Sequence, residues 1–156
     1  GVYWNTREDA MADDTPAGEQ AMPDPSVMRG VIPYLNLRGQ AGAAADFYVR
    51  AFGATDLGRM PSPETPGRFL HLQVAINGGC LMMTDHVADG EPAGAGLQGA
   101  HMQLVVRDGR KWWDRAIAAG CRVVAPYERQ FWGDDWGLCE DPFGIQWAVL
   151  EPGPGR

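Results

Sequence analysis

The sequence contains little of what a membrane protein or a nucleic-acid-binding protein needs. Its 156 residues hold 13 Lys and Arg against 20 Asp and Glu, a net charge of −7. This negative balance disfavours binding to nucleic acid or to an anionic membrane surface. No apolar run approaches the roughly 18 residues of a transmembrane helix. No basic segment followed by an apolar one, typical of a secretory signal, opens the chain, so we expect a cytoplasmic location.

Cysteine is also scarce. The three cysteines, Cys80, Cys121 and Cys139, are widely spaced and form no C-x-x-C pair, which argues against a disulfide scaffold and against a zinc knuckle. Cys139 precedes Glu140 and Asp141, whose negative charges should raise the pKa of its thiol and make it a poor nucleophile. The chain also lacks a serine nucleophile elbow, a phosphate-binding P-loop and a dinucleotide-binding fingerprint.

What the chain does contain is a composition that divides it into segments. Hydrophobic residues make up 45% of it, enough for a packed core. The first 30 residues are acidic and lack apolar periodicity, which predicts an arm outside the core. The predicted divisions are an N-terminal arm (1–30), one domain (31–151) built from module one (31–86), a Gly/Ala/Pro linker (87–98) and module two (99–151), and a C-terminal tail (152–156).

The two modules repeat one pattern of elements. Helical spacing over Ala41–Phe52 and Gly109–Ala119 ends at Gly53 and Gly120, which lie 67 residues apart. Each helix is preceded by one predicted strand and followed by three, an internal repeat. The predicted strands are Val31–Leu37, Thr55–Met60, Phe69–Ile76 and Cys80–Asp85, then Ala100–Val106, Arg122–Ala125, an extended segment Gln130–Glu140 and Ile145–Leu150. The pattern predicts an α+β fold of two βαβββ modules that pair into a curved, half-closed mixed sheet with the helices outside.

This order of elements carries recognisable motifs. They are Pro33-Tyr34-Leu35, Phe47-Tyr48, Phe52-Gly53-Ala54, Phe131-Trp132-Gly133-Asp134 and Asp141-Pro142-Phe143-Gly144. Together they resemble the vicinal oxygen chelate superfamily of glyoxalases, bleomycin-resistance proteins and dioxygenases, and within it the PhnB-like branch. The resemblance covers residues 31–151 and implies a ligand cleft in the curved sheet and a homodimer.

In the enzymes of that superfamily a divalent metal lies in the cleft, held by His and Glu from the first and last strand of each module. The corresponding positions here hold His101, Pro33 or Tyr34, Met82 or Met83, and Ala148. Only His101 is a usual ligand, and a hard divalent ion needs about three firm donors. We therefore expect no metal and no other cofactor; a divalent metal held by His101 and further ligands is the alternative.

Strand alternation identifies the side chains that would line the cleft. In Phe69–Ile76 and Ala100–Val106 the apolar residues share one face, so the polar ones should face the cleft. The same rule turns Tyr34 inward, whereas a direct count from Phe47 favours Pro33. The predicted lining is His71, Gln73, His101, Gln103, Tyr34 and Asn36, with Thr84 and Met82 near it. Neutral groups of this kind suit a polar, uncharged or weakly charged molecule, although strand histidines are usually bonded to a neighbouring carbonyl or glutamine.

The segment Phe131–Gly137 places Trp132 and Trp136 on either side of two carboxylates. One interpretation is an aromatic clamp over a flat or cationic ligand, with Asp134 or Asp135 as counter-charge. The other is a structural turn in which Trp132 fills the core and Asp134 caps the backbone. The sequence does not decide between these two interpretations.

Three functions follow from these observations. The favoured one is binding of a small molecule in the cleft without a metal. The alternative is a metal-dependent glyoxalase- or dioxygenase-type enzyme that uses His101, and the third is a non-catalytic dimeric interaction protein. We expect a small-molecule ligand and a second copy of the chain as partners, and neither nucleic acid nor membrane.

Overall fold

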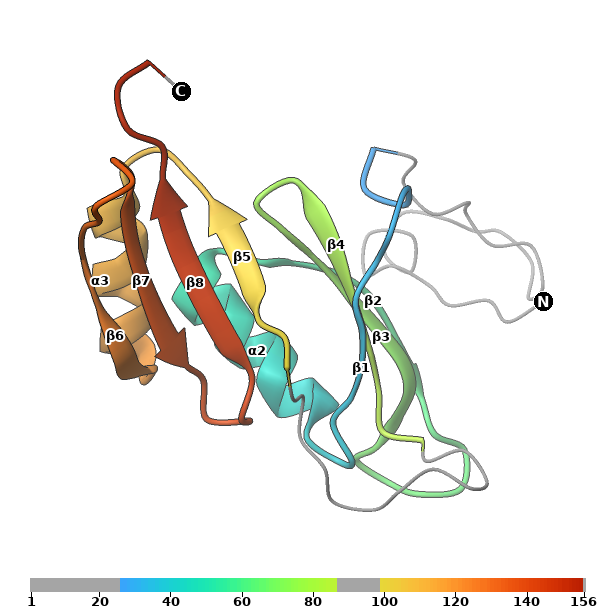
Figure 1. Cartoon of the computed structure of the whole chain (residues 1–156). Helices are drawn as coiled ribbons and strands as arrows, with labels where there is room; N and C mark the ends of the chain where they lie inside the picture. The colour runs from blue at the N-terminus through green and yellow to red at the C-terminus, as the bar shows by residue number, and fades with distance from the viewer. Residues whose placement is uncertain (1–25, 87–98, 156) are drawn as a thin grey trace. The chain divides into compact units, whose positions relative to one another are not determined.

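The computed structural model describes residues 26–86 and 99–155, which form two compact units with the same topology. The first contains β1 (Tyr34–Asn36), α2 (Ala41–Phe52), β2 (Thr55–Pro61), β3 (Phe69–Ile76) and β4 (Gly79–Thr84). The second contains β5 (Met102–Val105), α3 (Gly109–Ala119), β6 (Arg122–Arg129), β7 (Asp135–Glu140) and β8 (Gln146–Glu151) (Figure 1). Among the described residues, no helix is both long and apolar enough to cross a membrane.

Each unit holds a four-stranded mixed sheet. The strand orders are β1-β4-β3-β2 and β5-β8-β7-β6, and in both sheets the first strand runs parallel to the last while the remaining pairs are antiparallel. The predicted repeat of βαβββ modules is therefore confirmed. The pairing of the two sheets into one curved surface stays a prediction.

Both helices have the predicted bounds because each ends at a glycine. Gly53 adopts a left-handed conformation with φ of 67°, and its N–H donates to the Val49 carbonyl at 3.2 Å while the next N–H donates to the Tyr48 carbonyl. Glycine reaches this conformation without steric cost. Asn77 and Gly78, with φ of 50° and 79°, form the predicted tight turn between β3 and β4.

The strands differ more from their predicted bounds. The strand predicted over Arg122–Ala125 continues to Arg129, because Pro126 lies on β6, an edge strand where its missing N–H breaks no ladder. The segment Gln130–Glu140 divides into a turn and β7. β1 and β5 are shorter than predicted, at three and four residues.

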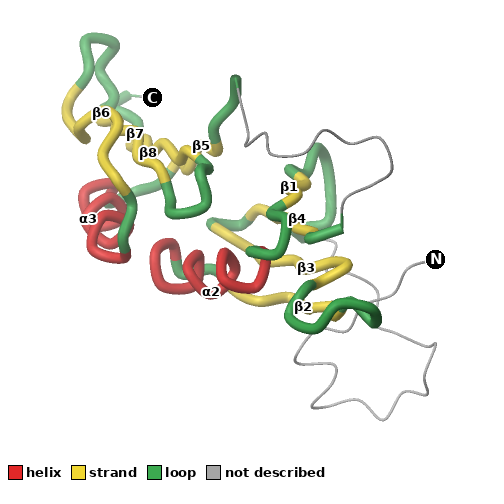
Figure 2. The backbone as a smooth tube through the Cα atoms, turned by 90° about the horizontal axis from the view of Figure 1, so that it is seen from below, coloured by secondary structure: helices red, strands yellow, loops and turns green. Residues whose placement is uncertain are grey.

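The cores consist of the apolar faces that alternation identified. In the first unit, Leu72, Val74 and Ile76 of β3 are buried, as are Phe47 and Tyr48 of α2. In the second unit α3 packs against β6, β7 and β8 (Figure 2) and buries Trp113 and Ala116. The second unit also includes Arg50–Phe52, and the ring centroids of Phe52 and Trp147 lie 4.5 Å apart.

A buried carboxylate joins the start of α2 to the ends of two strands. Asp85, 2% exposed, follows β4; its Oδ1 accepts hydrogen bonds from the Gly39 N–H at 2.6 Å and the Ala41 N–H at 3.0 Å. Its Oδ2 accepts one from the Phe69 N–H at 3.0 Å, at the start of β3. Gln40, at the N-cap of α2, makes no side-chain cap hydrogen bond. Asp85 therefore caps the N-terminus of α2 in place of an N-cap side chain, although it lies more than 40 residues away in the sequence.

The second unit has a simpler version of this arrangement. Glu151, the last residue of β8, accepts a hydrogen bond from the Gly109 N–H at the start of α3, with an Oε1 to N distance of 2.8 Å. In both modules a carboxylate at the end of the last strand thus caps the helix.

We expect Asp85→Asn to lower the free energy of unfolding by about 1–3 kcal/mol. The amide nitrogen of Asn is a donor, so it cannot accept the hydrogen bonds that a carboxylate oxygen now accepts from backbone N–H groups. Urea denaturation measures this change. The control is Asp114→Asn, which alters an exposed helix carboxylate 3.7 Å from Arg110 and should change stability by no more than about 0.5 kcal/mol. Equal stabilities of the two variants would contradict the capping role.

Candidate functional site

A row of hydrogen-bonded polar side chains crosses one face of the first sheet. The Tyr34 hydroxyl lies 2.7 Å from His71 Nδ1, and His71 Nε2 lies 3.4 Å from Gln73 Oε1. The Gln73 amide donates to the sulfur of Met28 at 2.7 Å. Strand register explains the grouping, because Met82 of β4 pairs with Tyr34 on one side and with Gln73 on the other. The structure therefore brings together three predicted lining residues, Tyr34, His71 and Gln73.

The row has a consistent direction. With the Gln73 amide donating to Met28, Gln73 Oε1 accepts from His71 Nε2–H, which leaves Nδ1 to accept from the Tyr34 hydroxyl. Burial lowers the pKa of His71, partly offset by the Gln73 hydrogen bond, and burial raises the pKa of Tyr34. Near neutral pH the row is thus a neutral imidazole, a neutral phenol and an amide, and a proton acceptor is present at the imidazole.

Asn36 and Thr84, also predicted to line the cleft, hold local backbone. The Asn36 amide donates to the His86 carbonyl at 2.7 Å, and its oxygen accepts from the Arg38 N–H at 3.0 Å. The Thr84 hydroxyl donates to the Leu70 carbonyl at 2.7 Å. These bonds fix the ends of β1, β3 and β4 around the polar row.

Met28 is a member of this site that sequence reasoning missed. It belongs to the segment predicted as an arm, yet its sulfur accepts from Gln73 and lies 3.8 Å from the Cys80 sulfur. Gln73 is 0% exposed and His71 9% exposed. The role of Gln73 as a cleft-lining residue stays a prediction. Residues 1–25 and the linker 87–98 lie outside the described residues.

The corresponding pair in the second module is more exposed. His101 lies just before β5, and its Nε2 is 3.3 Å from Gln103 Oε1. Both residues are exposed, whereas the next residue of β5, Leu104, faces the core and is 5% exposed. The histidine–glutamine contact that the sequence left as the usual alternative is therefore present.

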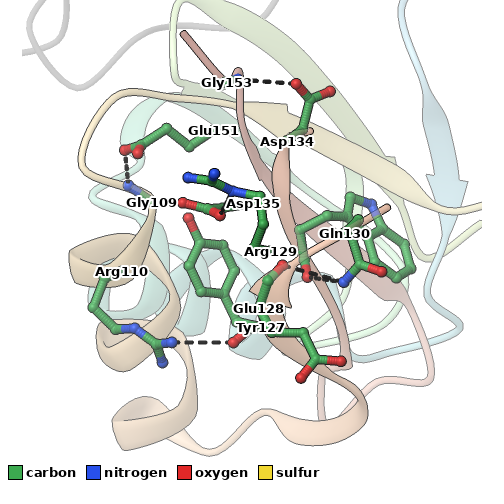
Figure 3. A network of polar contacts seen from close by, with 11 residues as sticks. Gly109, Arg110, Tyr127, Glu128, Arg129, Gln130, Asp134, Asp135, Glu151 and Gly153 are labelled. Carbon is green, nitrogen blue, oxygen red and sulfur yellow. Dashed lines mark hydrogen bonds and ion pairs between the residues drawn. The ribbon is translucent and has the colours of Figure 1, made fainter. Parts of the chain in front are cut away.

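The tryptophan segment matches neither of its two interpretations fully. Trp132 is 40% exposed, and its ring centroid lies 6.2 Å from that of Trp136, so Trp132 does not fill the core. Asp134 is 1% exposed and accepts a hydrogen bond from the Gly153 N–H at 2.9 Å (Figure 3). This hydrogen bond agrees with the interpretation in which Asp134 caps the backbone, and a role of Asp134 or Asp135 as counter-charge to a ligand stays a prediction. Asp135 is paired with Arg129.

The Asp141–Gly144 turn is also held by its carboxylate. Asp141 Oδ1 accepts from the Phe143 and Ile145 N–H groups at 2.9 Å each, and Oδ2 accepts from the Trp147 indole N–H at 3.0 Å. This motif is structural, as a predicted hairpin turn should be.

The buried thiols of Cys121 and Cys139 interact. A hydrogen bond from Cys121 lowers the pKa of Cys139, against the opposing effects of burial and Asp141, and the same bond raises the pKa of Cys121. The expected raised pKa of Cys139 is therefore wrong, because the sequence did not reveal its thiol neighbour. With both side chains buried, neither thiol is presented to a substrate.

The family follows from comparison with known proteins. The model of the Glyoxalase/Bleomycin resistance protein/Dioxygenase superfamily matches residues 34–149. The chain belongs to this superfamily. It is 39% identical over 118 residues to an uncharacterized protein of Mycobacterium tuberculosis, covering 72% of this chain and 68% of that one.

Solved structures share the fold of this chain. Protein PA1353 from Pseudomonas aeruginosa is 26% identical with a TM-score of 0.66, covering 80% of this chain and 98% of that one. A PhnB protein from Bacillus cereus is 15% identical with the same TM-score of 0.66, covering 79% and 99%. The predicted fold agrees with these neighbours.

The residues present do not fit the divalent metal of the superfamily's enzymes. Strand register places Ala148 beside Gln103 and Met82 beside Tyr34, so neither last strand supplies a carboxylate at these positions. A thioether is too soft a donor for a hard divalent ion. Within residues 26–86 and 99–155, no group of three or more His, Cys, Asp or Glu side chains is arranged to hold a metal ion.

The lowered pKa of His71 predicts a pH dependence of stability. The unfolded chain binds this proton near the ordinary pKa of about 6.5, while the folded chain binds it only at lower pH. The stabilisation by neutral His71 is therefore fully present above about pH 6.5 and is lost as the pH falls through the folded pKa. Urea unfolding at about pH 7.5 and about pH 5.5 should show this loss in the wild type and a smaller one in His71→Gln.

The matched control is His101→Gln, which changes an exposed histidine with the same glutamine contact. It should keep the wild-type pH dependence. If His71→Gln and the wild type lost the same stability on acidification, the buried neutral histidine would not be the cause.

Proposed function

We propose that this protein binds a small, polar, uncharged or weakly charged molecule on the sheet face that carries Tyr34 and His71, without a metal. The observation that carries the proposal is the directed row from Gln73 to Tyr34. Its donors and acceptors are fixed in orientation by one another, as recognition of a polar ligand requires. No charged side chain belongs to the row, so it suits an uncharged partner better than an ion.

The two ends of the row define what the ligand must offer. Tyr34 is 53% exposed, and while its proton is directed at His71, its oxygen keeps lone pairs that can accept from a ligand N–H or O–H. At the other end the Gln73 amide donates to a thioether, a weak acceptor. A ligand carbonyl that replaced Met28 would give Gln73 a stronger acceptor. The ligand class that fits is an amide, lactam or similar heterocycle with a donor and an acceptor.

The polar row is not needed for the packing of the sheet. The opposite face of β3 already buries Leu72 and Val74 in the core. An apolar row in place of His71 and Gln73 would avoid the cost of burying polar groups. A site that retains this cost is better explained by recognition than by stability.

A library of neutral amide- and lactam-containing fragments, followed by ligand-detected NMR, tests this function. We expect a subset of fragments to bind the wild type and to bind Tyr34→Phe and Gln73→Leu about tenfold more weakly, since each variant removes one hydrogen-bonding end. His101→Gln is the control and should bind like the wild type. Fragments that bound all four proteins equally, or none of them, would refute the proposed site.

The proposed absence of a metal has its own measurement. Protein purified without a chelator or a histidine tag and incubated with Ni, Mn, Zn and Fe(II) should retain well below one ion per chain by mass spectrometry. His101→Ala should retain as little as the wild type. A stoichiometric ion that is lost in His101→Ala would instead favour a metal-dependent enzyme.

A further inference from the structure

A cavity lies within the second unit. It has a volume of about 460 Å³, and its lining comes from the start of α3, from β6 and from the ends of β7 and β8 (Figure 3). Four carboxylates and three cationic side chains line it, and the eighth lining residue is Tyr127. A cavity of this size accommodates a small ligand, and its charged walls call for a polar one.

Tyr127 is the only residue with a buried side-chain oxygen or nitrogen that lacks a hydrogen-bond partner within the described ranges 26–86 and 99–155. Its side chain is 7% exposed. The hydroxyl reaches into the space that Gly109 leaves free, since a Cβ on Gly109 would lie 2.0 Å from it. Buried polar atoms are normally paired, so an unpaired one beside a cavity indicates a missing partner.

Two residues of α3 contact the Tyr127 ring. Trp113 stacks on it with ring centroids 5.8 Å apart. The Arg110 guanidinium, also on α3, lies 4.8 Å from the ring centroid and donates to the Tyr127 carbonyl at 3.0 Å. Burial, with Glu151 and Asp135 nearby, raises the pKa of Tyr127 to about 12, so the hydroxyl keeps its proton.

The charges around this hydroxyl are of both signs. Glu151 commits one carboxylate oxygen to the Gly109 N–H and has a second for a ligand. Lys111 lies at the start of α3, where the helix dipole also favours an anion. Four carboxylates would repel a simple anion, and three cationic side chains would repel a simple cation. A molecule that carries both charges finds an oppositely charged group for each of them.

We propose that this cavity binds a small zwitterion. Its ammonium group bonds to the Tyr127 hydroxyl oxygen and the Glu151 carboxylate, and its anionic group lies beside Lys111 at the start of α3. The Arg129–Asp135 ion pair, at 2.6 Å with the Arg129 side chain 61% exposed, gives way to admit the ligand, because exposed pairs are weak.

The test uses 4-aminobutyrate, a zwitterion, with butyrate and butylamine as probes that each lack one charge. Amide NMR shifts of Gly109, Arg110 and Lys111 report binding to the full chain. We expect 4-aminobutyrate to bind the wild type at least about tenfold more tightly than either single-charge probe. Binding of butyrate or butylamine as tight as that of 4-aminobutyrate would overturn the zwitterion, as would no binding at all.

Tyr127→Phe removes only the unpaired hydroxyl. It should leave the thermal stability of the ligand-free protein unchanged or raised, because a buried unpaired polar group is lost, and it should weaken 4-aminobutyrate binding about tenfold. Lys111→Met, an exposed change, should weaken binding as well. The control Tyr34→Phe makes the same substitution in the first module and should bind normally. If Tyr127→Phe and Lys111→Met both bound 4-aminobutyrate as tightly as the wild type, this proposal would be wrong, independently of whether the polar row binds its proposed ligand.

Discussion

The buried carboxylate of Asp85 is the interaction on which the first module depends. Its two oxygens accept three hydrogen bonds from backbone N–H groups, one in the loop before α2, one in α2 itself and one in β3. Without it these N–H groups would be buried and unpaired, which folded proteins avoid. By fixing the start of β3 against the end of β4, Asp85 also sets the register that aligns Tyr34, Met82 and Gln73 in one row.

Two tyrosines show how differently one functional group can be used in the two modules. Tyr34 is half exposed, and its proton is committed to His71; what it offers a ligand is a directed lone pair. Tyr127 is buried, and its hydroxyl lacks a hydrogen-bond partner among the described residues. The hydroxyl can therefore both donate a hydrogen bond to a ligand and accept one from it. The first arrangement favours a ligand selected by hydrogen-bond direction. The second favours one selected by charge, because ionic groups surround the hydroxyl.

Periodic features could be predicted from the sequence, and isolated contacts could not. Both helices have their predicted ends because glycines stop them, and the alternation of β3 places His71 and Gln73 together on one face. Met28 was not predicted because the acidic segment that contains it has no apolar periodicity to single it out. Tyr127 was not predicted because it lies between the predicted strand Arg122–Ala125 and the extended segment Gln130–Glu140, where no element was assigned. The interior position of Asp134 depends on Gly153, 19 residues away, a distance that local patterns do not reach.

The buried carboxylates also change what the net charge of −7 means for recognition. Asp85, Asp134 and Asp141 are each at most 4% exposed and accept backbone N–H groups, so part of the acidity of the chain lies inside it. At the surface, Arg59, Arg122 and Arg129 pair with further carboxylates. The field that a ligand meets is therefore set locally by a few opposed groups rather than by the total charge. For this reason a neutral polar row and a cavity lined by charges of both signs can both exist on an acidic protein, and the ligand that we propose for each is not the one that the total charge would predict.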